Sequence, residues 1–306
     1  QGLPRVPAAA GGLRGGDGSL RLARFATGKG LTMVRSIWIR PDSIFDGQTL
    51  SKGQAIRIDG DRVVEVCNLP QGQTADRVVG LVSPGYLDLQ VNGGGGVLLN
   101  STPTPEGIDA IAAAHRRFGT VGILPTLITD APEVLERTTE SVLLIWGKRG
   151  ILGLHIEGPH ILVQRRGTHA ERFIRPLDAR TIDCVSRLRA AGVPVMITLA
   201  PEAVSSEQIA TLAQMGAVVS IGHSDASADD VRQALSAGAR CFTHLFNAMS
   251  PLLHRSPGVV GAALNSTVHA GIICDGVHVA DELVGLAIRA RPKPDARTAG
   301  RGARTP

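Results

Sequence analysis

The chain has 306 residues, of which 43% are hydrophobic and 3% aromatic. This length is sufficient for one large domain with a substantial core and a small accessory domain. The scarcity of aromatic residues favours a parallel, helix-covered sheet built from Val, Ile, Leu and Ala. Because no apolar run approaches about 18 residues, a membrane span is excluded.

The formal net charge of +5 is concentrated at the two ends of the chain. Residues 1–32 contain five basic residues and one acidic residue, and residues 289–306 contain six basic and one acidic, so the middle is acidic. A nucleic-acid-binding face on the folded part is therefore not expected.

The four cysteines are widely spaced and form no CxxC pair. They indicate neither a disulfide framework nor a cysteine zinc site, and they favour a reducing, cytoplasmic compartment.

In chain order, residues 1–33 are rich in Gly, Arg and Ala without periodicity. We expect a disordered tail, with an organelle transit peptide as the alternative because acidic residues are scarce. Residues 34–80 then alternate between apolar and polar, with Asp-Gly turns at 46–47 and 59–61. These signals predict a small antiparallel β element ahead of the main domain.

From residue 81 the period changes, and apolar runs alternate with helical segments that end in Gly. The predicted strands are 81–91, 122–129, 151–158, 193–200, 218–224, 241–246 and 270–276. Seven successive βα units over residues 81–291 predict a (β/α)₈ barrel of the TIM type. No eighth strand is found, so the barrel is expected to be incomplete, or else to be an open seven-stranded sheet. Residues 292–306 are read as a disordered, non-native-looking tail, as after a truncation or a frame shift.

Three metal-competent residues lie at or near the carboxyl ends of predicted strands: Glu157, His223 and His244. The carboxyl ends of parallel strands meet at one edge of a sheet, where ligands bind in such proteins. One carboxylate and two neutral imidazoles form the protein ligand set of a catalytic zinc, with the fourth position open to water. The alternative is that the histidines belong to the core and Glu157 caps a helix.

Several motifs together resemble those of the N-acetylglucosamine-6-phosphate deacetylases of the amidohydrolase superfamily. They are, in chain order, PGYLDLQVNGGGGV, LHIEGP, RRGTH, IGHSDA, THLFNAMS, HRSPG and CDGVHV. The resemblance covers residues 34–291 and implies a metal-dependent barrel with a small β-sandwich at 34–80. Its implied metal ligands are Glu157, His223 and His244. Gln90 and Asn92 occupy the place of the HxH pair of many amidohydrolases, so we expect one divalent metal, zinc.

The resemblance also implies a set of contacts with an amino-sugar phosphate. They are Thr168, His169, Asn247, Ala248, Arg255 and His278. The forked guanidinium of Arg255 suits phosphate oxygens, and His169 could hydrogen-bond the acetyl carbonyl and oppose its developing charge.

The implied reaction is metal-assisted removal of acetate from N-acetylglucosamine 6-phosphate to give glucosamine 6-phosphate. It needs a carboxylate that accepts and returns a proton, which the family places at the end of strand eight. Asp295 lies in the context PKPDART, neither apolar nor strand-like, so that role is not assigned to it. We therefore expect little or no activity. The alternatives are a non-catalytic amino-sugar-phosphate binder and another amidohydrolase activity. The open sheet edges are compatible with a homodimer, and so is the resemblance to this family.

Overall fold

The computed structural model of the protein describes residues 36–292. The tails predicted at 1–33 and 292–306 lie outside the described residues, apart from Pro292. The described chain forms two compact units that divide between Gly85 and Tyr86.

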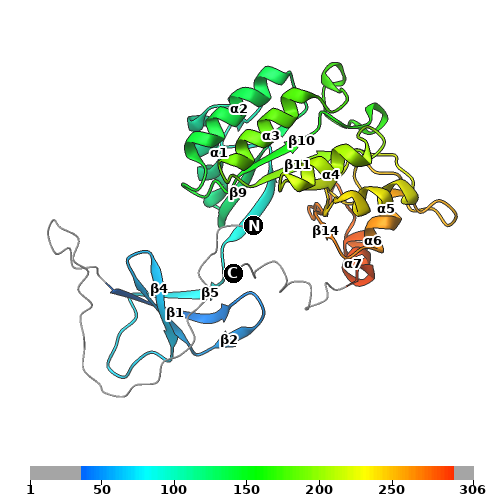
Figure 1. Cartoon of the computed structure of the whole chain (residues 1–306). Helices are drawn as coiled ribbons and strands as arrows, with labels where there is room; N and C mark the ends of the chain where they lie inside the picture. The colour runs from blue at the N-terminus through cyan, green and yellow to red at the C-terminus, as the bar shows by residue number, and fades with distance from the viewer. Residues whose placement is uncertain (1–35, 293–306) are drawn as a thin grey trace, which may run out of the picture. The chain divides into compact units, whose positions relative to one another are not determined.

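The first unit is one five-stranded sheet (Figure 1). Its strands are β1 (Ser36–Phe45), β2 (Leu50–Lys52), β3 (Ala55–Asp59), β4 (Arg62–Cys67) and β5 (Arg77–Val82). Both expected hairpins are present, since β1 pairs with β2 and β3 with β4 in antiparallel fashion. The Asp46 carboxylate closes the first turn by accepting from the backbone N–H groups of Gln48 and Thr49, both at 2.8 Å.

Three of the four strand pairings are antiparallel, as predicted, but β5 pairs with β1 in parallel. A parallel partner requires the chain to cross over before it pairs, and residues 68–76 make this connection. The crossover ends at Asp76, whose carboxylate accepts a hydrogen bond from the backbone N–H of Trp38 at 2.8 Å.

The second unit contains a seven-stranded sheet in the order β14-β13-β12-β11-β10-β9-β6, in which every neighbouring pair is parallel. Its strands are β6 (Tyr86–Val91), β9 (Thr120–Ile128), β10 (Leu154–Glu157), β11 (Val195–Leu199), β12 (Val218–Ile221), β13 (Cys241–Phe242) and β14 (His269–Ala270). A small hairpin of β7 (Gly93–Gly94) and β8 (Val97–Leu98) follows β6. The predicted α/β architecture with seven parallel strands is confirmed.

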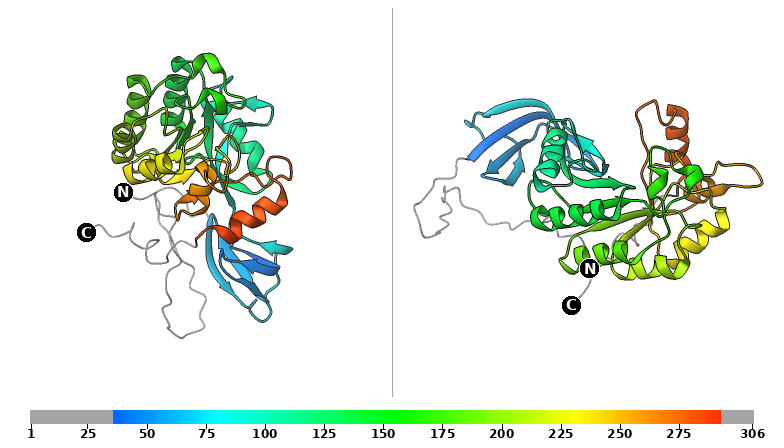
Figure 2. Two further views of the ribbon diagram at one scale, coloured as in Figure 1. Left: turned by 90° about the vertical axis from the view of Figure 1, so that its right-hand side faces the viewer. Right: turned by 90° about the horizontal axis from the view of Figure 1, so that it is seen from above.

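Helices connect these strands and pack against one another in chain order (Figures 1 and 2). They are α1 (Pro105–Arg116), α2 (Pro132–Ile145), α3 (Ala179–Ala190), α4 (Ser206–Gln214), α5 (Ala228–Ala237), α6 (Gly258–Leu264) and α7 (Asp281–Ala290), with 3₁₀ turns η1 (Val163–Arg165) and η2 (Glu171–Phe173). Aliphatic side chains dominate the core between helices and sheet, as the composition predicts. None of the helices formed by residues 36–292 combines the length and apolar character that a bilayer crossing requires.

Three predicted strands differ clearly from the observed ones. The run 270–276 is replaced by the two-residue strand His269–Ala270. The run 81–91 is split between β5 and β6, which belong to different units. Pro84 lies in the break and has no N–H to contribute to a ladder. The run 241–246 is a strand only at Cys241–Phe242. The chain leaves the sheet there because His244, Phe246 and Ala248 adopt positive φ angles of 39°, 79° and 51°, which extended strands exclude.

Candidate metal centre

The three predicted ligands meet at the carboxyl edge of the seven-stranded sheet. Glu157 is the last residue of β10, and His223 and His244 each follow the last residue of β12 and β13 by two positions. Oε1 of Glu157 lies 3.2 Å from Nε2 of His223 and 3.1 Å from Nε2 of His244, and the two Nε2 atoms are 3.0 Å apart. All three side chains are buried, so the three donor atoms form a compact triangle shielded from solvent.

Backbone carbonyl groups determine which nitrogen of each imidazole carries the proton. Nδ1 of His223 lies 2.8 Å from the carbonyl oxygen of Arg165, and Nδ1 of His244 lies 3.1 Å from that of Asn247. A carbonyl can only accept, so each Nδ1 donates and, in the neutral ring, each Nε2 presents a lone pair. Two lone pairs and a carboxylate oxygen therefore face one another at contact distance, an arrangement that a cation stabilises.

The donor set fits a divalent metal ion. Bonds of 2.0–2.1 Å at tetrahedral angles place neighbouring ligand atoms roughly 3.3 Å apart, close to the observed separations of 3.0–3.2 Å. Hydrogen bonds from the distal imidazole nitrogens to backbone carbonyls are the usual support of metal-binding histidines. Among the described residues, this trio is the one group of His, Cys, Asp and Glu that comes close enough to share an ion.

Glu157 is ionised despite its burial. Burial alone raises the pKa of a carboxyl group, but the adjacent imidazoles of His223 and His244 outweigh it and hold the pKa of Glu157 well below its ordinary value. Gln90, on β6, adds a further contact, since its Nε2 donates to Oε1 of Glu157 at 2.8 Å. The amide expected to be a poor ligand thus lies directly against a ligand oxygen.

Below the triangle, polar side chains from several strands form a hydrogen-bonded layer. His155 lies two residues before Glu157 on β10, and its Nε2 is 2.7 Å from Oγ1 of Thr198. Thr198 in turn contacts Thr243 at 2.7 Å, and Thr243 contacts Ser220 at 2.6 Å. Burial lowers the pKa of His155 to about 4, so the ring is neutral near pH 7 and this layer carries no charge.

His169 stands beside the triangle. Its ring centroid lies 4.3 Å from that of His223, and its side chain is buried. Burial, together with the nearby His223, lowers the pKa of His169 to about 4, so its imidazole is also neutral near pH 7. Its Nδ1 lies 2.7 Å from Oγ1 of Thr129.

The other predicted substrate contacts do not touch the triangle of donor atoms. Asn247 follows His244, and its buried Nδ2 has no hydrogen-bond partner among the described residues. The carbonyl of Ala248 accepts from the N–H of Ser224 at 3.0 Å. Three members of the set are exposed, and no contact joins them to the triangle: Thr168, Arg255 and His278. His278 pairs instead with Asp275, at 2.6 Å.

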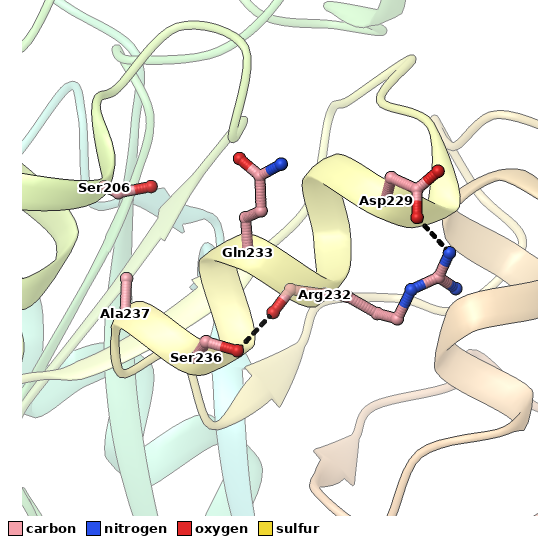
Figure 3. A pocket seen from close by; sticks show the side chains of 6 residues that line it. All are labelled: Ser206, Asp229, Arg232, Gln233, Ser236 and Ala237. Carbon is pink, nitrogen blue, oxygen red and sulfur yellow. Dashed lines mark hydrogen bonds and ion pairs between the residues drawn. The ribbon is translucent and has the colours of Figure 1, made fainter.

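A shallow hollow of about 510 Å³ lies elsewhere, on the helices (Figure 3). Its lining consists of Ser206, at the start of α4, and of side chains from α5, where Asp229 and Arg232 form an ion pair. None of the predicted site residues contributes to this hollow, which therefore has no evident connection with the metal centre.

Sequence reasoning did not identify three residues that contact the site: His155, Thr129 and, as a direct partner of Glu157, Gln90. For two of them, the position relative to the predicted strands could have indicated a role in the site. Strand periodicity places His155 on the same face as Glu157, and Thr129 is the last residue of a predicted buried strand, a position similar to that of the ligands.

A parallel half-barrel sheet with a buried Glu-His-His cluster at its carboxyl edge defines an α/β protein of the TIM-barrel type with a candidate metal site. Solved structures of N-acetylglucosamine-6-phosphate deacetylases share this fold. The enzyme of Pasteurella multocida superposes with a TM-score of 0.75 at 30% identity, over 84% of this chain and 69% of that one. The enzyme of Mycobacterium smegmatis also has a TM-score of 0.75, at 33% identity, over 83% of this chain and 73% of that one.

Sequence relatives agree. An N-acetylglucosamine-6-phosphate deacetylase of Bos taurus is 32% identical over 92% of this chain and 70% of its own length. An N-acetylgalactosamine-6-phosphate deacetylase of Shewanella sp. (strain ANA-3) is 45% identical over 65% of this chain and 51% of its own length. No family model matches the sequence. The chain belongs to the N-acetylglucosamine-6-phosphate deacetylase family, which confirms the resemblance, and it spans between about half and 70% of the length of these relatives.

Proposed function

We propose that this protein binds one zinc ion through Glu157, His223 and His244 and uses the site to recognise an N-acetylated amino-sugar 6-phosphate for deacetylation. The observation that carries this proposal is the triangle of donor atoms with both histidine protons directed outward to backbone carbonyls. The names of the relatives supply the substrate class.

The zinc ion would supply Lewis acidity that lowers the pKa of water towards neutrality. The chain's own residues hold and orient the reactants. The neutral His169 donates a hydrogen bond to the acetyl oxygen, and the unpartnered Nδ2 of Asn247 donates to the sugar. Arg255 neutralises the phosphate. Thr168, Ala248 and His278 complete the proposed contacts.

The proton-accepting carboxylate that the reaction needs is not found at the centre within the described residues. Glu157 is the one carboxylate of the cluster, and a ligand oxygen already shared with two imidazoles is a poor proton acceptor because its pKa is strongly lowered. Asp295 lies outside the described residues. We therefore propose that this chain binds metal and sugar phosphate with little or no turnover.

Two N-acetylated sugar 6-phosphates are candidates for the ligand. Most of the named relatives act on the glucosamine derivative, but the Shewanella protein, at 45% identity, is named for N-acetylgalactosamine 6-phosphate. The two sugars differ in the orientation of one hydroxyl group, so both must be tested side by side.

Metal content provides the first test. Purified chain, treated with a chelator and then with zinc, should take up one equivalent of zinc, as measured by elemental analysis and calorimetric titration. Glu157→Gln should weaken this binding strongly because it replaces the anionic ligand with a neutral amide. Glu171→Gln, in the exposed turn η2, is the matched control and should bind as the original chain does. Absence of zinc uptake by the unmodified chain would refute the assignment.

Turnover and binding of the sugar phosphates provide the second test. Zinc-loaded chain is incubated with each N-acetylated sugar 6-phosphate, and acetate release is followed alongside calorimetric binding. Binding with negligible acetate release is the expected result, and it is also what a non-catalytic sensor would show. Absence of binding by the zinc-loaded chain would contradict the proposed substrate class.

A further inference from the structure

Thr129 lies directly after β9 and makes two contacts with the same nitrogen of His169. Its Oγ1 is 2.7 Å from Nδ1 of His169, and its backbone N–H points to that atom with an N–N distance of 3.3 Å. Both side chains are almost completely buried, at 3% and 2% exposure.

The backbone donor determines the protonation of the His169 ring. A hydroxyl group can rotate to donate or accept, but a backbone N–H can only donate. That of Thr129 has no other acceptor among residues 36–292. A proton on Nδ1 would leave this buried N–H without an acceptor, which is unfavourable. The neutral ring therefore carries its proton on Nε2.

Gly158 provides the space for this contact. A Cβ atom built at Gly158 would lie 2.3 Å from Oγ1 of Thr129, and the residue has a φ of +75°. Any larger residue at this position would push the hydroxyl away from His169. The loop that follows Glu157 is therefore shaped around the pair of Thr129 and His169.

We propose that Thr129 is a positioning residue that fixes His169 in the Nε2–H form, so that this N–H is available to the acetyl oxygen of a ligand at the metal centre. Nε2 makes no hydrogen bond to another described residue, and the ring lies against His223. The inference rests on the proposed function, since it presumes that His169 serves as the donor.

The histidine nitrogen shifts of the full zinc-loaded chain test the assignment directly. With ¹⁵N-labelled histidine, long-range ¹H–¹⁵N spectra distinguish the two neutral forms, and His169→Gln identifies the signals. We expect the Nε2–H form in the original chain and in Thr129→Ser, which keeps both donors. Thr129→Val keeps the backbone N–H and loses only the hydroxyl group, so the Nε2–H form should persist while the Nδ1 shift moves further from that of Nε2, because Nδ1 loses one of its two hydrogen-bond contacts. A proton on Nδ1 in the original chain, or an unchanged Nδ1 shift in Thr129→Val, would overturn the proposal.

Ligand binding provides a second measurement, the difference in affinity between an acetylated and a non-acetylated sugar phosphate. A purely structural role of Thr129 would leave this difference unchanged. Thr129→Val should bind N-acetylglucosamine 6-phosphate about fivefold more weakly, the effect of one impaired hydrogen bond. Its affinity for glucosamine 6-phosphate, which lacks the acetyl group, should not change, and Thr129→Ser should restore the original selectivity. An equal loss for both ligands would overturn the positioning role. If the original chain binds neither sugar phosphate, the proposed function fails instead, whereas the nitrogen shifts still report on Thr129.

Discussion

At the scale of single residues, the metal centre depends on groups that hold its ligands as well as on the ligands. The carboxylate of Glu157 accepts from Gln90 on one side and faces two imidazoles on the other. A side-chain amide is neutral, so it restricts the carboxylate without competing for the cation. Residues of this kind typically contribute 10–100-fold to metal affinity.

Replacement of Gln90 by Leu should weaken zinc binding by about 10–100-fold, because the Glu157 carboxylate then loses the donor that orients it. Competition with a chromophoric chelator measures the affinity. Gln233→Leu, on the exposed face of α5, is the control and should bind zinc as the original chain does. Equal affinities of Gln90→Leu and the original chain would show that the amide has no orienting role.

A second residue-scale prediction concerns His160, which is fully buried between the carbonyl of Arg175 and the hydroxyl of Thr181. Burial lowers its pKa below the ordinary value of 6.5. As the pH falls below 6.5, the unfolded chain gains a proton that the folded chain does not, so the free energy of unfolding decreases. This loss continues until the pH reaches the folded-state pKa.

His160→Gln should therefore make the fall in unfolding free energy below pH 6.5 shallower, by at most about 1.4 kcal/mol per pH unit. Urea unfolding at several pH values from 7 downwards through 6.5 measures the slope. The same substitution at the exposed His254 is the comparison. A slope that is identical in His160→Gln and the original chain would contradict the prediction.

At the scale of elements, the strands explain why the ligand trio was predictable from sequence. Buried parallel strands are continuous apolar runs, and their carboxyl ends share one edge. A polar residue directly after such a run therefore has a predictable position, as Glu157, His223 and His244 show. The number of parallel strands and their alternation with helices follow from the same apolar patterns.

Other features depend on contacts that no local pattern encodes. Strand β13 has two residues because the chain turns into left-handed conformations at His244, Phe246 and Ala248. The parallel pairing of β5 with β1 depends on a crossover rather than on turn residues. The pair of Thr129 and His169 joins residues 40 positions apart in two loops. Such contacts arise from tertiary packing, which can override local preference.

Helix α5 begins immediately after the loop that carries His223, and its first turn has a complete capping box. The Ser227 side chain accepts from the N–H of Asp230, and the Asp230 carboxylate accepts from the N–H of Ser227. Ser227→Ala should lower the free energy of unfolding by about 1 kcal/mol. Ser236→Ala, near the end of the same helix, should cost less. Urea unfolding of both variants and the original chain at neutral pH measures the two losses. Equal losses would contradict the capping role of Ser227.

At the scale of the whole molecule, metal binding and stability are coupled. The three ligands come from three strands of one sheet, so the unfolded chain cannot present them together. Zinc at about 100 times its dissociation constant should therefore raise the free energy of unfolding of this unit by about 2.7 kcal/mol. Thermal unfolding with zinc and with a chelator measures this shift. The shift should disappear in Glu157→Gln, and its persistence there would place the stabilising zinc at another site.

Both histidines of the metal centre stand on backbone with a positive φ, 52° for His223 and 39° for His244. Residues other than glycine, and to a lesser degree asparagine and aspartate, are disfavoured in this conformation. If codons 223 and 244 were fully randomised and the library sorted for abundance of folded protein alone, glycine and asparagine should be enriched over histidine. Sorting the same library for zinc retention should return histidine at both codons. The metal centre is thus placed where chain geometry and ligand chemistry prefer different amino acids.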